Sequence, residues 1–165
     1  MEEVITIRRV TADDQGQVVQ MIREIMDHEF KDDSAAYPTQ DIENISQTYG
    51  KLGEAFFVAV TEKRIIGTAA IKKEDDRVAL LRRLFVARDF RKQDIGLKLI
   101  DKALQFCDEV GYQEVVFKTT SKMQAAARTC QKRGFIQRAK LQLGNVELLK
   151  FVCALPNGHQ KNKKG

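Results

Sequence analysis

The sequence of 165 residues contains no tryptophan, only three cysteines and no hydrophobic run as long as a membrane span. Cys107, Cys130 and Cys153 are odd in number and widely spaced. They match neither a zinc-ligand pattern nor a disulfide framework, which favours reduced thiols and no metal site. The polar start Met1-Glu2-Glu3 is unlike a signal peptide. The sequence therefore predicts a cytoplasmic protein without a membrane segment.

The composition is that of an ordinary soluble protein, with 43% hydrophobic and 31% charged residues. The length suits one domain with a substantial core. No internal repeat or low-complexity linker divides the chain. We expect one domain over residues 1–155, followed by a basic, disordered tail over 156–165.

Charge is distributed unevenly along the chain. Residues 1–43 have eleven acidic and four basic side chains, for a net charge of −7, whereas the remainder has a net charge of +12. A pI near 9.1 suggests nucleic-acid binding. However, the basic residues are interspersed with acids, and no nucleic-acid motif or aromatic platform is present. An anionic cofactor that meets a cationic acceptor explains the asymmetry at least as well, so no nucleic-acid partner is predicted.

Hydrophobic periodicity predicts a mixed α/β domain. Helices are expected from residue 11 to about 30, from 39 to about 50, over 95–110 and over 121–133. Strands are expected over 4–10, 55–60, 65–71, 78–86, 114–118, from 135 and over 145–154. The resulting order is βααβββαβαββ.

The most informative stretch is the junction between the strand that ends at Val86 and the helix that begins near Ile95. Its basic loop reads Arg91-Lys92-Gln93-Asp94-Ile95-Gly96. A loop that enters a helix gathers backbone N–H groups and the positive end of the helix dipole, which is how many folds hold a phosphate. A second motif follows at Arg133-Gly134-Phe135, where a helix ends and a strand begins.

These motifs and the element order resemble the GCN5-related N-acetyltransferase (GNAT) family over residues 4–154. The resemblance implies a single-domain acyl-CoA N-acyltransferase fold, with a mixed central sheet flanked by helices. It also implies that acetyl-CoA is the acetyl donor. The family contacts to CoA would fall on the strand end and the loop, at Leu84, Phe85, Val86, Arg91, Lys92, Gln93, Asp94, Ile95, Gly96 and Leu97.

The strand part of this set would pair with the pantetheine arm like an added strand. Such pairing needs a free strand edge, which splaying of 78–86 from 114–118 would supply. In the loop, Asp94 stands where the family usually has a glycine. Aspartate tolerates left-handed backbone, but its carboxylate brings negative charge toward a diphosphate. We therefore expect a functional but weakened CoA site.

The second motif departs further from the family pattern. Aligned on Gly134 and Phe135, it places Met123 at the usual asparagine and Cys130 at the usual tyrosine. The family's tyrosine is thought to protonate the departing thiolate. A cysteine thiol could replace it as the catalytic acid, or Cys130 could be a core residue on a helical stripe with Ala127.

The general base and the acceptor site are less defined. The strand 78–86 contains no Asp or Glu, so the glutamate common in the family is absent. The acids nearest by topology are Glu54, Glu74, Asp75, Asp76, Asp32 and Asp33. The loop over 28–38 contains acids and aromatics that could receive a cationic amine, or it could be an ordinary exposed loop. His28 is expected at the helix surface.

The sequence thus predicts an acetyl-CoA-dependent N-acetyltransferase that acts on a primary amine of a small molecule or protein through a ternary complex. The alternative is a catalytically weak CoA-binding sensor or interaction module, which the substitutions at Asp94, Met123 and Cys130 favour. The oligomeric state is open, a homodimer being one option.

Overall fold

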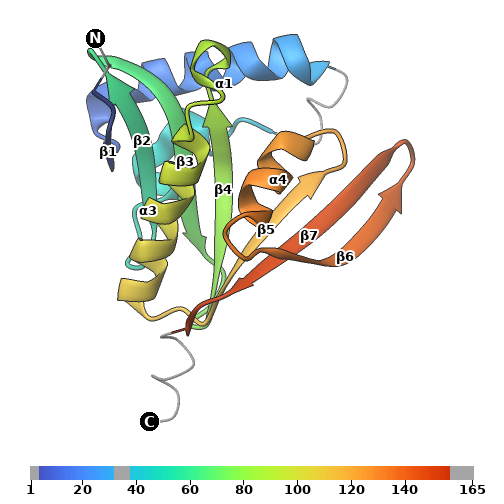
Figure 1. Ribbon diagram of the computed structural model, residues 1–165. Helices are drawn as coiled ribbons and strands as arrows, with labels where there is room; N and C mark the ends of the chain where they lie inside the picture. Colours follow the sequence, from blue (N-terminus) through green and yellow to red (C-terminus); the bar gives the residue numbers. More distant parts are fainter. Residues whose placement is uncertain (1–3, 32–37, 157–165) are drawn as a thin grey trace.

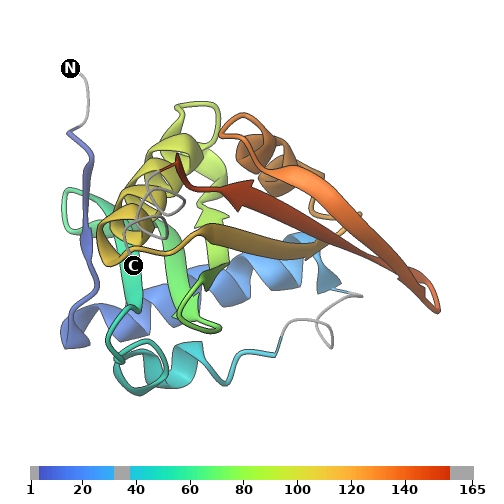
Figure 2. The same cartoon turned by 90° about the horizontal axis from the view of Figure 1, so that it is seen from below.

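The computed structural model describes residues 4–31 and 38–156. They form one seven-stranded sheet in the order β1-β2-β3-β4-β5-β7-β6. Only β4 and β5 are parallel neighbours, and all other neighbours are antiparallel. Helices α3 and α4 cover one face, and α1 and α2 cover the other (Figures 1 and 2). The strands are β1 (Thr6–Arg9), β2 (Ala55–Thr61), β3 (Arg64–Lys73), β4 (Val78–Val86), β5 (Glu114–Thr120), β6 (Ile136–Leu143) and β7 (Val146–Ala154).

The helices are α1 (Gln15–Glu29), α2 (Ile45–Thr48), α3 (Ile95–Val110) and α4 (Gln124–Gln131). Short 3-10 turns lie at Ala12–Asp14, Ile42–Asn44 and Arg88–Phe90. The observed order is the predicted βααβββαβαββ, so the fold prediction is confirmed. Among the described residues, no helix is both long and apolar enough to cross a membrane.

Local sequence explains the main boundaries. Asp14 accepts hydrogen bonds from the backbone N–H and the hydroxyl of Thr11, which forms a capping box ahead of α1. Gly111 ends α3 with φ of 105°, a left-handed conformation that favours glycine. Helix α4 is shorter than predicted, because a turn in which the Met123 N–H bonds to the Thr120 carbonyl precedes it. Val110, the last residue of α3, is 46% exposed.

The core lies on both faces of the central strands. Almost every residue of β2 and β3 is buried, because helices cover both sides of these strands. Phe57, Ile66 and Leu99 are among the fully buried side chains. In contrast, all eight residues of β6 are exposed at the edge of the sheet.

The sheet opens between β4 and β5. The two strands pair only from Val78 with Glu114 to Leu81 with Phe117, and they diverge beyond that point (Figure 1). On the other side of β4, the register with β3 shifts between Thr68 and Ala70, which forms a β-bulge at Arg83. The expected splaying of these strands is thus present, and it leaves the end of β4 with an edge that no neighbouring strand occupies.

Candidate active site

The loop before α3 contains left-handed backbone, which Asp94 is expected from the sequence to tolerate. Lys92 and Asp94 have positive φ values of 71° and 61°. Asp94 immediately precedes α3, and its side chain makes no capping hydrogen bond. The first N–H groups of this sixteen-residue helix therefore have no helical partner and can donate to an anion.

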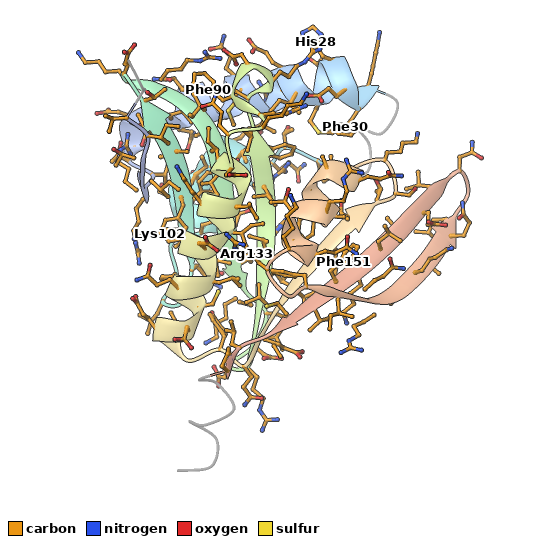
Figure 3. All side chains as sticks on the ribbon, viewed as in Figure 1. His28, Phe30, Phe90, Lys102, Arg133 and Phe151 are labelled. Carbon is orange, nitrogen blue, oxygen red and sulfur yellow. The ribbon has the colours of Figure 1, made fainter. Side chains whose placement is uncertain are left out.

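A cavity of about 670 Å³ runs from this loop to the end of β4 and along α4. Nine of the ten residues predicted to contact CoA line it, and Gln93 is the exception. Phe30 and Phe90 also line it and lie on the two sides of the upper end of β4 (Figure 3). From the sequence alone, the aromatics of 28–38, which include Phe30, are candidates only for binding an acceptor amine, and Phe90 has no assigned role, although it lies four positions after Val86.

Gly96 lies between α4 and the end of β4, where it lines this cavity. A Cβ atom at residue 96 would lie 3.4 Å from Thr129 Cγ2 and 3.8 Å from Val86 Cγ2. A larger side chain would therefore project into the space between β4, α3 and α4. A Cβ alone would make ordinary contacts here, so it is the outer atoms of a larger side chain that would take up space in the cavity.

The charge around the cavity is predominantly positive. Arg91 is paired with Glu29, at 2.5 and 2.7 Å, and its Nε donates to the Val86 carbonyl at 3.1 Å. The Arg91 hydrogen bonds hold the pKa of Glu29 below its usual value. The remaining lining cations are Lys92, Lys122, Arg128 and Lys132. A polyphosphate ligand would meet these cations and the N-terminus of α3 together.

On the opposite side of the sheet, a buried ion pair holds the bulge in β4. Arg83 has φ of 53°, its guanidinium contacts the Asp41 carboxylate and the Pro38 carbonyl, and its own carbonyl accepts a bond from Thr68 at 2.6 Å. Asp41 also accepts a 2.6 Å bond from Tyr49. Burial raises the pKa of Asp41, but the bonds from Arg83 and Tyr49 outweigh burial and leave it below its usual value. The Asp41 carboxylate is therefore ionised, and it holds the Arg83 side chain at the bulge.

A second cavity of about 350 Å³ occupies the gap between β4 and β5. It shares Leu84, Phe85 and Met123 with the larger cavity. The two cavities are therefore adjacent at the end of β4.

The acids proposed as general bases have other roles where they are described. Glu54 is buried and accepts bonds from the Lys51 and Lys73 N–H groups, both at 3.1 Å, and from Lys72. Burial raises the pKa of Glu54, and these bonds reverse that effect. Asp75 closes the β3–β4 turn by accepting two backbone bonds at 2.8 Å. Glu74 and Asp76 are exposed in the same turn. Asp32 and Asp33 lie outside the described residues.

Cys130 lies in the core, with no exposed surface, and does not line either cavity. Burial, and secondarily Cys153, raises the pKa of its thiol well above the usual value. This placement favours the interpretation of Cys130 as a core residue. His28 is exposed on α1 and points away from the sheet (Figure 3), as predicted. Among the described residues, no three potential metal ligands cluster.

The mixed seven-stranded sheet with helices on both faces is that of the acyl-CoA N-acyltransferase fold. The model of the Acetyltransferase (GNAT) family matches residues 19–135. The chain therefore belongs to the GNAT acetyltransferase family.

Known relatives agree with this assignment. The chain is 32% identical to N-acetyltransferase 8B of Homo sapiens over 129 residues, which cover 71% of this chain and 57% of that protein. It is 35% identical to the N-acetylaspartate synthetase of Xenopus tropicalis over 97 residues, 58% of this chain and 36% of that protein. The aligned regions thus span about half or less of these relatives' lengths.

Solved structures show the same fold. A GNAT acetyltransferase from Staphylococcus aureus Mu50 superposes with a TM-score of 0.79 at 24% identity, over 92% of this chain and 99% of that one. A putative acetyltransferase from Salmonella typhimurium, solved with its cofactor acetyl-CoA, gives 0.76 at 18% identity over 92% and 94%.

Proposed function

We propose that this protein transfers the acetyl group of acetyl-CoA to a primary amine within a ternary complex. The observation that supports this most directly is that the two cavities lie side by side at the unpaired end of β4 and share lining residues there. The larger cavity combines a helix N-terminus with basic side chains, which suits the diphosphate of CoA. The acceptor would approach from the gap between β4 and β5.

The backbone of β4 provides donors for the carrier. The Ala87 N–H donates to the Ile66 carbonyl of β3. Because successive residues of a strand alternate the side to which their backbone groups point, Val86 directs its N–H away from β3, toward the gap. We infer that this N–H donates to a carbonyl of the pantetheine arm or of the thioester. A donor near the thioester would stabilise the oxyanion that forms during transfer.

In the proposed reaction, the neutral amine attacks the thioester carbonyl carbon. A C–N bond forms, the C–S bond breaks, and the amine loses one proton while the CoA thiolate gains one. The described residues supply no obvious general base, so we propose that water accepts the amine proton. Positioning and the oxyanion donor would then provide most of the rate.

The alternative is a CoA-binding module without turnover. The buried Cys130 favours it, because the thiol that replaces the family tyrosine does not line the cavities. Both functions require acetyl-CoA to bind in the larger cavity. They differ in whether thiol is released when an amine is added.

Gly96→Val tests the donor site with a matched control. The added side chain would fill space against Thr129 and Val86, and we expect acetyl-CoA affinity, measured by calorimetry, to fall at least tenfold. Gly16→Val is the control, because a Cβ there meets no atom within 4 Å. Equal affinity of wild type and Gly96→Val would contradict the proposed cofactor site, provided that thermal unfolding shows both folded.

Turnover is tested by following thiol release from acetyl-CoA against a panel of amines. Release that depends on the amine and disappears in Gly96→Val supports the transferase. Binding of acetyl-CoA without release against any amine would support the sensor instead.

A further inference from the structure

The cavity between β4 and β5 has a distinctive set of charges. Its described lining includes Arg82, Arg83 and Lys118, and no aspartate or glutamate. Asp41 neutralises Arg83 through their buried ion pair. Arg82 instead lies 6.0 Å from the centroid of the Tyr49 ring. Arg82 and Lys118 therefore leave the cavity with an excess of positive charge.

Lys118 has an unfavourable neighbour across the sheet. In the register between β5 and β7 it lies opposite Lys150. Like charges at directly opposed positions repel each other and destabilise a sheet. An anion bound beside Lys118 would relieve this repulsion, which is a reason to look for a negatively charged group in the ligand.

A second, independent observation points to a ligand at the same place. Thr119 lines this cavity and is 4% exposed, yet its hydroxyl has no hydrogen-bond partner. Buried hydroxyls are normally satisfied, as Thr68 is by the Arg83 carbonyl. A polar ligand in the gap would supply the missing bond.

We infer that the acceptor is an amine that also bears a carboxylate, of the amino-acid type. Arg82 and Lys118 pair with the carboxylate, and the Thr119 hydroxyl donates a hydrogen bond to the same ligand. This inference rests on the proposed transferase function and differs from the sequence-based expectation of a cationic acceptor held by acids. The positive charge of the same cations would disfavour the protonated form of the bound amine. A larger fraction of the amine would then be neutral and able to attack.

Matched acceptors test the inference on the full chain. L-Phenylalanine and phenethylamine differ by one carboxylate, and spermidine is a polycation. We expect kcat/KM, from thiol release, to be at least tenfold higher for phenylalanine than for phenethylamine, and lowest for spermidine. Higher kcat/KM with phenethylamine or spermidine would overturn the inference while leaving the transferase function intact.

Single substitutions test whether each of these residues binds the acceptor. Arg82→Gln and Lys118→Gln should each raise KM for phenylalanine at least fivefold and so lower the ratio of kcat/KM for phenylalanine to kcat/KM for phenethylamine. Thr119→Val, which keeps the side-chain shape, should raise KM for phenylalanine several-fold without changing KM for acetyl-CoA. Lys102→Gln removes a cation from α3, outside both cavities (Figure 3), and should change none of these values.

An unchanged phenylalanine-to-phenethylamine ratio in both Arg82→Gln and Lys118→Gln would refute the assigned cation roles. Absence of thiol release with every acceptor, while calorimetry still shows acetyl-CoA binding, would overturn the transferase function and with it this inference. The two results can be told apart, because a ratio of kcat/KM values can be measured only if thiol is released, whereas the second result is the absence of any release.

Discussion

The two parts of the sheet on either side of the gap are built differently. Strands β1–β4 are covered by α1 and α2 on one face and by α3 on the other, and β2 and β3 are almost entirely buried. Strands β5–β7 end in a hairpin whose outer strand, β6, is wholly exposed (Figure 1). Strands β2 and β3 in the first part are thus mostly buried, whereas in the second part β5 is mostly buried and β6 is exposed. The proposed site lies at the seam between them.

This arrangement has a physical logic. Parallel pairing between β4 and β5 stops after Leu81 and Phe117, and the bulge at Arg83 bends the rest of β4 away. Backbone groups left without a strand partner cost free energy unless something else binds them. The seam is thus a place inside the described sheet, away from its outer edges, where a ligand can take the place of a neighbouring strand.

The largest effect is expected where a buried ion pair holds the seam. Asp41→Asn would leave the Arg83 guanidinium buried without its counter-charge, since both side chains are below 10% exposed. We expect a loss of about 3–5 kcal/mol in the free energy of unfolding, measured by urea denaturation. The double variant Asp41→Asn/Arg83→Met should recover part of this loss. If the double variant is as unstable as the sum of the two single variants, the pair is not coupled.

A matched pair of aliphatic truncations compares the two parts of the sheet directly. Ile66→Ala in β3 removes a fully buried side chain, and we expect a loss of about 2–5 kcal/mol. Leu141→Ala in β6 removes a side chain that is 57% exposed, and the change should stay within about 0.5 kcal/mol. Equal losses in the two variants would show that β6 is covered in solution.

The ion pair between β1 and the turn before α1 should make the stability depend on pH. Hydrogen bonds from Arg8, at 2.7 and 3.0 Å, outweigh burial and lower the pKa of Asp14 to about 2. Because the folded pKa is below the unfolded one, this contribution is present above about pH 4 and is lost as pH falls toward 2. Asp14→Asn should cost about 1–2 kcal/mol at pH 7, and the difference should vanish near pH 2. A cost that does not change between pH 7 and pH 3 would argue against the ion pair.

The smallest effect concerns the cofactor end of the seam. Asp94 has left-handed backbone and places a carboxylate at the edge of the larger cavity. Asp94→Gly keeps the favoured backbone and removes the charge, so acetyl-CoA should bind about threefold to tenfold more tightly in calorimetry. Glu62→Gly is the control, since Glu62 also has positive φ but lies in the β2–β3 turn. Unchanged or weaker binding by Asp94→Gly would refute a repulsive role for this carboxylate.

Much of the fold could be predicted because its signals are local. The bounds of α3 and β4 agree with the sequence prediction, since periodic apolar residues and a terminal glycine mark them. The loop before α3 was predictable for the same reason: consecutive residues build it. Helix α4 was predicted too long, because a turn that ends at Met123 competes with the first helical turn.

The acceptor side could not be predicted in this way. One cavity is lined by residues from both β4 and β5, because these strands begin as neighbours and then diverge. The residues concerned are Arg82, Lys118 and Thr119. Nothing in the local pattern around Thr119 distinguishes its unpaired hydroxyl from that of an ordinary strand threonine. Glu54 seemed a candidate base by topology, but its bonds to Lys51, Lys72 and Lys73 make it a structural residue.

The sequence by itself determined the family, the order of the elements and the helix N-terminus that faces the proposed cofactor, because short-range periodicity and turn chemistry specify these features. Only the tertiary structure decided that Cys130 is buried, that Asp41 holds Arg83, and that two cations share one cavity. The physical reason is that burial and charge pairing depend on residues distant along the chain, whose meeting is set by strand register and by where that register ends.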